Sequence, residues 1–194
     1  MKTRDKILLV ALELFNAEGV GGQSAVDIAS AMGISAGHLY YHFKGKAEIL
    51  AELMAAHREE VDLVVSALRE AARGPEPSIE TLWTHVHILV EEAWDARFFY
   101  REPALALGHD AIAAHARHIF AAQRTGLGEM LDALAGTGAL KASPEVCDGL
   151  AGQLVTGIGF HIHVLAMEGL DEPPRERIAR AAAQVMIPVA GLAS

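Results

Sequence analysis

The sequence predicts an all-helical chain, in which a short three-helix unit at the N-terminus precedes a larger helical bundle, with about nine helices in total. Apolar residues recur at intervals of three and four along most of the chain, which places them on one face of successive helices. Glycine, proline and serine separate these stretches, at positions where helices stop and start. No run of residues alternates convincingly in the manner of a β-strand.

The first three helices are short and closely spaced. An apolar face predicts a helix over residues 3–17, and Gly19 supplies its stop. A second amphipathic pattern covers residues 24–32 and ends at Gly33. A third helix can begin at Ser35, whose hydroxyl suits an N-cap. Two short helices joined by a glycine turn make a helix-turn-helix.

The third helix offers small and hydrogen-bonding groups, and Lys44 and Lys46 follow it directly. Such a surface suits the groove and phosphates of DNA. The residues that form it are Ser35, Gly37, His38, Tyr40, Tyr41 and His42.

This N-terminal region resembles the tetracycline-repressor (TetR/AcrR) family of bacterial regulators. The resemblance covers about the first quarter of the chain and is specific, because it fixes residue types at many positions in one register. The residues that carry it are Phe15, Gly19, Ser24, Ile28, Ala29, Gly33, Ile34, Ser35, Gly37, Leu39, Tyr40, His42, Phe43 and Lys46.

The resemblance implies a DNA-binding role for the helix-turn-helix. It implies that Gly37 and His38 approach base edges, and that Ser35, Tyr40, Tyr41, His42 and Lys46 approach phosphates. The whole set is Ser24, Ser35, Ala36, Gly37, His38, Tyr40, Tyr41, His42 and Lys46. Many family members carry an arginine near the start of the preceding helix, where this chain has Val26. With no long basic side chain there, readout would depend on close approach, water or DNA shape.

The rest of the chain predicts five longer helices, which cover residues 46–72, 78–95, 110–134, 144–168 and a final stretch after Pro174 that Pro188 ends at about residue 187. Between the second and third lies an aromatic cluster at residues 97–103. The cluster resembles an RFFYR-type stretch of the family subgroup whose third helix reads LYYHF. We therefore expect a DNA-binding domain at residues 1–46 and an effector-binding and dimerisation domain at residues 47–194.

The last two helices are apolar, and the first of them is rich in glycine, which favours a four-helix interface with a second copy. The alternative is that they pack only within one subunit. The residues expected at the dimer interface are Leu150, Leu154, Ile158, Ile162, Leu165, Ile178, Ala182 and Val185.

The resemblance also implies a cavity in the body that holds a small, largely apolar effector. Aromatic residues at helical spacing are more often plain core, so both interpretations stay open for each of them. The residues expected to contact the effector are Trp83, His87, Trp94, Phe98, Tyr100, Phe120, Gln153 and Phe160.

The chain carries a net charge of −9, but residues 1–46 hold five basic and four acidic side chains, so the remainder carries −10. We call residues 1–46 the head and residues 47–194 the body. A nearly neutral head on an acidic body permits local contact with phosphates and disfavours loose, non-specific binding to DNA. Cys147 is the single cysteine, which suits a reducing compartment. No signal peptide and no spanning apolar run is recognisable, so we expect a soluble, cytoplasmic protein.

The sequence predicts no enzyme, cofactor or metal site. His85 and His87 are about 200° apart on a helix, as are His161 and His163, so neither pair can share one ion. No phosphate loop or nucleophile motif occurs. The expected function is a homodimeric regulator, a repressor by family default, that binds a palindromic operator and is released by its effector. The alternative is a helical small-molecule-binding or protein-interaction module without DNA binding.

Overall fold

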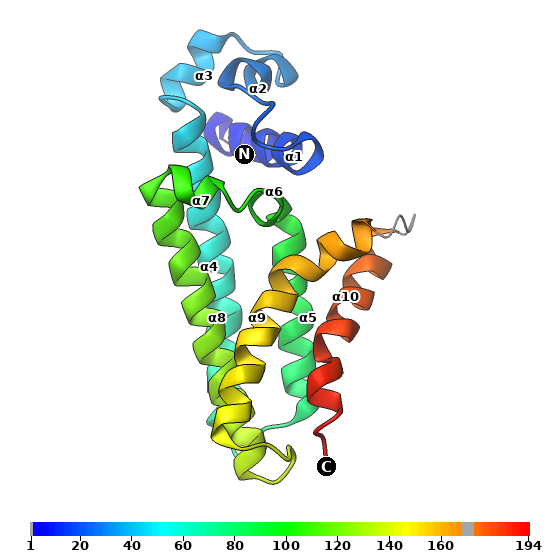
Figure 1. Cartoon of the computed structure of the whole chain (residues 1–194). Helices are drawn as coiled ribbons and strands as arrows, with labels where there is room; N and C mark the ends of the chain where they lie inside the picture. Colours follow the sequence, from blue (N-terminus) through cyan, green and yellow to red (C-terminus); the bar gives the residue numbers. More distant parts are fainter. Residues whose placement is uncertain (1, 168–172) are drawn as a thin grey trace. The chain divides into compact units, whose positions relative to one another are not determined.

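The structure is a computed structural model that describes residues 2–167 and 173–194 (Figure 1). Its described residues form ten helical segments, in line with the prediction of about nine, and the all-helical class is confirmed. The segments are α1 (Thr3–Glu18), α2 (Ala25–Ala31), α3 (Ala36–His42), α4 (Lys46–Ala72), α5 (Ile79–Asp95), α6 (Arg97–Arg101), α7 (Leu105–Gly108), α8 (Asp110–Gly136), α9 (Pro144–Met167) and α10 (Pro174–Ala190).

The contacts within the chain divide it into two compact units. The first contains Met1–Arg58 and Asp95–Ala116, and the second contains Glu59–Trp94 and Arg117–Ser194. The predicted domain boundary at residue 46 falls at the start of α4, and the first unit extends beyond it. This unit therefore holds not only α1 to α3 but also the beginning of α4 and the α6 segment.

The core of the first unit forms where α1, α2 and α3 meet. Phe15 of α1, Ile28 of α2 and Leu39 of α3 are fully buried, and Phe43, directly after α3, is almost so. Burial of such side chains contributes roughly 1.5–3 kcal/mol each. The long first helix thus braces the two short ones, which could not be stable alone.

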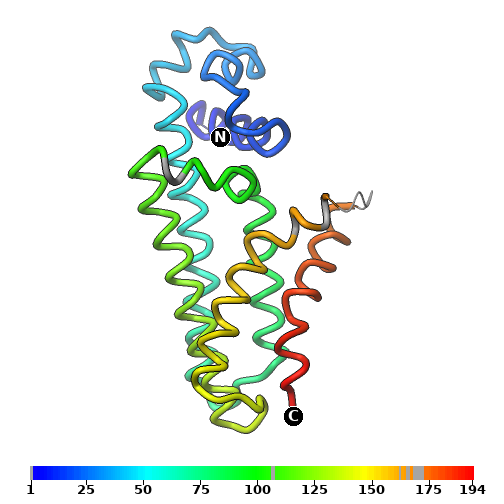
Figure 2. The backbone as a smooth tube through the Cα atoms, in the orientation of Figure 1, coloured from blue at the N-terminus to red at the C-terminus, as the bar shows by residue number. Residues whose placement is uncertain are grey.

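In the second unit, α9 runs beside α10, as the yellow and the orange-to-red segments of Figure 2 show. Gly157 of α9 lies against Val185 of α10, and a Cβ atom on the glycine would come within 2.9 Å of a Val185 methyl group. The glycine therefore allows the two helices to approach closely at this position. None of the helices described here is both long and apolar enough to cross a membrane.

The predicted end of the last helix at Pro188 is wrong. The helix continues to Ala190 with Pro188 inside its last turn. Proline lacks an N–H group and so removes one helical hydrogen bond, but it does not prevent a helix from continuing for a further turn. Gly191 closes the end by donating its N–H to the carbonyl of Ile187 at 3.2 Å.

A buried polar pair joins α4 to α6 within the first unit. The Nε2 atom of His57 lies 2.9 Å from the hydroxyl of Tyr100, and the two side chains are 6% and 2% exposed. Burial lowers the pKa of His57 from 6.5 to about 4, because the charged imidazolium loses its hydration there. At neutral pH the ring is therefore uncharged.

This pair predicts a loss of stability in mild acid. Between pH 6.5 and 4 the unfolded chain binds a proton at His57 that the folded chain does not, so stability falls as the pH falls. Across this window the wild type should lose about 3 kcal/mol more unfolding free energy than a His57→Gln variant, which keeps a hydrogen-bonding side chain without the titration. Urea unfolding of both proteins at pH 7 and pH 4 measures the difference, and parallel losses would contradict the assignment.

Candidate functional site

The helix-turn-helix begins at a reciprocal cap on α2. The Ser24 hydroxyl oxygen accepts a hydrogen bond from the Asp27 N–H at 3.2 Å, and the Asp27 carboxylate accepts one from the Ser24 N–H at 2.8 Å. The hydrogen bonds from Ser24 lower the pKa of Asp27. Gly33, with φ of +66°, then turns the chain toward α3 in a conformation that glycine adopts without strain.

Helix α3 has one face in the core and one face in solvent. Ser35 caps it, since its hydroxyl oxygen accepts the N–H of His38 at 3.2 Å. Leu39 anchors the buried face. On the other face Gly37 and His38 are exposed, and Tyr40 and Tyr41 are 50% and 84% exposed. Exposed tyrosines beside a glycine give this face both hydrogen-bonding groups and a point of close backbone approach.

Lys46 is directed into the protein. Its ammonium group donates to the carbonyl oxygens of Val20 at 2.9 Å and Gln23 at 2.8 Å, which lie in the loop between α1 and α2. With the hydroxyls of Ser24 and Ser35 engaged as caps, three of the nine residues expected at DNA have their polar groups engaged in building the head. Ala36 and His42 are half-buried. The outward set is therefore Gly37, His38, Tyr40 and Tyr41.

Sequence reasoning missed Asn16, which joins α1 to the segment around α6. Its side-chain Nδ2 donates to the carbonyl of Asp95 at 2.7 Å, and its Oδ1 accepts from the N–H of Phe98 at 2.9 Å. The backbone carbonyl of Asn16 also accepts from Arg101 Nη1 at 3.0 Å. Asn16 is only 6% exposed, so each of these bonds satisfies a group with little access to water.

A second contact lies beside it. The Glu102 carboxylate accepts the N–H of Val20 at 2.6 Å, just after α1 ends. We call the contacts of Asn16 and Glu102 the α1–α6 junction. Its partners are about 80 residues apart in sequence, which hides the pairing from local patterns.

Most of the residues predicted at the dimer interface are buried within the single chain. The six of them with described side chains, Leu150, Leu154, Ile158, Ile178, Ala182 and Val185, are at most 8% exposed. The side chains of Ile162 and Leu165 lie outside the described part of the structure.

The opposite face of α9 is open to solvent, and its residues follow one another at intervals of three and four. This outer α9 stripe consists of Val146, Gly149, Gln153, Thr156, Phe160, Val164 and Met167.

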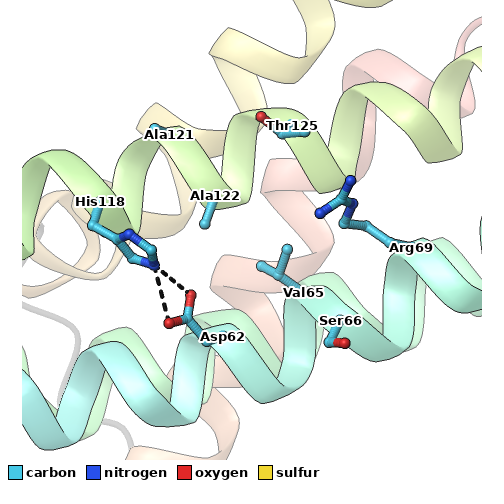
Figure 3. Close-up of a pocket in the computed structure, with 8 residues that line it drawn as sticks. All are labelled: Asp62, Val65, Ser66, Arg69, His118, Ala121, Ala122 and Thr125. Atoms are coloured by element: carbon cyan, nitrogen blue, oxygen red, sulfur yellow. Dashed lines mark hydrogen bonds and ion pairs between the residues drawn. The ribbon is translucent and has the colours of Figure 1, made fainter.

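A surface groove of about 360 Å³ runs between α4 and α8 in the second unit (Figure 3). His118 and Asp62 face each other across it, with His118 Nε2 at 2.8 and 3.0 Å from the two carboxylate oxygens. Arg69 pairs with Glu129 at 2.7 Å. The polar side chains of the groove are thus paired across the two helices. Among the described residues no three His, Cys, Asp or Glu side chains are grouped to hold a metal ion.

The comparison with protein families agrees with the geometry of the head. A model described as bacterial regulatory proteins of the tetR family matches residues 7–53. A second model, TetR, described as a bacterial transcriptional repressor, matches residues 63–193, which is more than half of the chain. The chain belongs to the TetR family. This family consists of bacterial transcriptional regulators.

Individual TetR-family proteins are similar over different lengths. The transcriptional regulator SrpR of Pseudomonas putida is 32% identical over 92 residues, which cover 47% of this chain and 39% of that protein. A TetR-family regulator from Marinobacter aquaeolei VT8 has a structure that covers 100% of this chain and 92% of its own, with a TM-score of 0.87 and 24% identity. The structure of a SmeT–triclosan complex covers 99% of this chain and 92% of its own, with a TM-score of 0.62 and 19% identity. The structural likeness supports the TetR fold.

The residues predicted to contact an effector belong to both compact units of the chain. Phe98 and Tyr100 are buried in the first unit, whereas the other six belong to the second. Trp83 and Phe160 are each 37% exposed, and Gln153 is exposed on the outer α9 stripe. The remaining three, His87, Trp94 and Phe120, are half-buried.

Gln123 is a buried polar residue of the body that sequence reasoning also missed. It follows Ile119 by four residues and precedes Leu127 by four, so it stands in the apolar stripe of α8. A glutamine at that spacing was the signal that could have identified it.

Proposed function

We propose that this TetR-family chain is a homodimeric repressor that binds a palindromic operator and is released by a small, largely apolar effector. The observation that carries the proposal is the outward face of α3, where Gly37, His38 and Tyr41 stand on a helix anchored by Leu39. One such helix from each copy would enter the major groove of a half-site. A regulator of this kind acts in the cytoplasm, where the chromosome lies.

The chemistry of this face favours contact through shape and short hydrogen bonds. Tyr41 and the following Lys44 are exposed and suit phosphate oxygens. Val26 at the start of α2 is 52% exposed and offers an apolar contact where many relatives have a cation. The wide major groove would then be read at Gly37 and His38, where the backbone can come close to base edges.

The outer α9 stripe supports the dimer. Its spacing is that of a helix seam against another helix, and Val146, Phe160, Val164 and Met167 are 43%, 37%, 42% and 79% exposed. Small Gly149 in the same row allows close approach. A second copy related by a twofold axis would present the same stripe and bury these side chains.

Release by an effector requires two states that differ in effector affinity. In one of these states the two heads of the dimer fit the operator, and in the other they do not. An effector that binds the second state more tightly lowers the affinity for DNA by the difference between its two affinities. The SmeT–triclosan complex shows that one protein of similar fold was solved with an apolar phenol ether. This supports an apolar effector for the present chain as well.

Operator binding is tested with a labelled fragment from upstream of the chain's own gene. We expect a shift at nanomolar to submicromolar protein that competitor DNA does not remove and that weakens steeply with salt. No specific shift on this fragment or on a genomic library would instead favour the helical module without DNA binding.

Substitution of Gly37 by alanine should separate DNA binding from folding. An added Cβ would meet only the Ser35 hydroxyl, at 3.9 Å, so the head has room for it, and helix propensity should raise stability by up to about 1 kcal/mol. Operator affinity should fall by about tenfold or more, because the methyl group would stand between backbone and base edges. Fluorescence anisotropy measures operator affinity, and thermal unfolding measures stability. The control is Ala31→Gly at the exposed end of α2, which should lower stability and leave operator affinity unchanged. Unchanged affinity for Gly37→Ala would exclude close backbone approach at this position.

A further inference from the structure

Three polar side chains are buried among the described residues: Asn16, His57 and Gln123. Asn16 holds its partners in the α1–α6 junction, and His57 is paired with the hydroxyl of Tyr100. Gln123 differs. Its side chain is 1% exposed, and its Nε2 atom has no hydrogen-bond partner in the described part of the chain. The chain thus keeps one buried amide donor that its own structure leaves unused.

The neighbours of Gln123 on the same face of α8 are apolar. Ile119 and Leu127, one turn away on either side along α8, are fully buried on the same face. Within the second unit, Gln123 is the one buried polar side chain that the described residues contain. A buried donor without an acceptor opposes folding, whereas a methionine of the same length would fill the space without this cost.

We propose that the Gln123 amide is the polar anchor for the effector, and that the effector is an uncharged, largely apolar molecule with a hydrogen-bond acceptor such as a ketone, ester or ether oxygen. The inference rests on the proposed function, which supplies an effector bound in the body. Nε2 carries two N–H groups, so the matching ligand atom is an acceptor.

The charge of the ligand follows from the same surroundings. No lysine or arginine is among the buried residues described in the second unit, although the Nε atom of Arg177 is shielded from water. Transfer of an anion into such a site is strongly unfavourable without a partner. A neutral acceptor satisfies the amide, and a hydrocarbon without one leaves it unpaired, so the amide selects between molecules of nearly equal size and shape.

A buried amide without a partner and a buried amide with partners should respond differently when an apolar side chain replaces them. In the ligand-free, full-length protein, Gln123→Met should leave the melting temperature unchanged or raise it by a few degrees, because Nε2 has no hydrogen bond to lose. Asn16→Leu, which removes an amide of similar burial with two partners, should lower it by roughly 5–15 °C. A fall for Gln123→Met as large as that for Asn16→Leu would show that the amide is already paired and would overturn the proposal.

The ligand class is tested with matched probes, 4-phenylbutan-2-one and butylbenzene, which differ in one carbonyl group. The ketone should stabilise the wild type more than the hydrocarbon does, and Gln123→Met should reduce ketone affinity by about 5- to 30-fold while leaving the hydrocarbon unaffected. Equal ketone binding by both proteins, or no ketone binding by the wild type, counts against the assignment.

A measurement of operator binding distinguishes a failure of the Gln123 proposal from a failure of the proposed function. Ligand-free Gln123→Met should bind the operator fragment as the wild type does, because the substitution lies outside the head. If the wild type itself fails to bind DNA, the proposed function fails, and the melting and probe comparisons still decide whether Gln123 holds a neutral acceptor.

Discussion

A glutamate in place of Val164 is expected to convert the proposed dimer into a monomer and to lower operator affinity by about 10²- to 10⁴-fold. Val164 is 42% exposed on the outer α9 stripe, so the single chain tolerates a charge there. In a twofold interface the substitution places two like charges close together, without partners, in an apolar seam. The affinity falls because each head then binds its half-site alone.

The control is Leu63→Glu. Leu63 lies on α4 and is 66% exposed, so it resembles Val164 as an exposed hydrophobic residue of the second unit. It lies outside the outer α9 stripe. Analytical ultracentrifugation and operator titration of both variants give the result. A Val164→Glu protein that remains dimeric at micromolar concentration would place the interface elsewhere.

Substitution of Asn16 by leucine should lower the free energy of unfolding by about 2–5 kcal/mol. The change leaves the buried N–H of Phe98 without its acceptor, which costs roughly 1–3 kcal/mol, and also removes the part-buried hydrogen bond to the carbonyl of Asp95. The side chains of asparagine and leucine have similar size, so lost hydrogen bonds dominate the effect. Urea unfolding measures it.

A conservative variant tests whether the hydrogen bonds or the packing matter. Asn16→Asp keeps the acceptor for the Phe98 N–H and loses the donor to Asp95, so it should show a different, pH-dependent loss. Gln23→Leu, on a partly exposed amide paired with the exposed Glu18, should change stability by less than about 0.5 kcal/mol. If Asn16→Leu proves as mild as Gln23→Leu, the α1–α6 junction contributes little to the fold.

The sequence predicted the helices well because local signals define their ends. Helix α4 was predicted over the residues that form it, since Gly45 precedes its apolar stripe and an Arg-Gly-Pro sequence follows it. The caps Ser24 and Ser35 were recognisable for the same reason. Such signals act within one turn of helix, where the sequence itself supplies both partners.

Long-range contacts were not predictable in this way. Lys46 resembles a phosphate-binding residue in the motif, yet its ammonium group is held by two carbonyls more than twenty residues earlier in the chain. On α9 nearly every residue is small or apolar, so periodicity could not tell the face that meets α10 from the face left to solvent. Aromatic composition likewise does not reveal which of the two compact units a side chain joins.

The open space around Gly37 has a consequence for how regulators of this kind diversify. Because the head gains or loses little when a small side chain appears there, the operator preference could change through single substitutions without a compensating change in the core. Libraries that vary residues 37, 38 and 41 should therefore retain folded proteins at high frequency. Such libraries offer a route to sets of mutually independent genetic switches that share one effector-binding body.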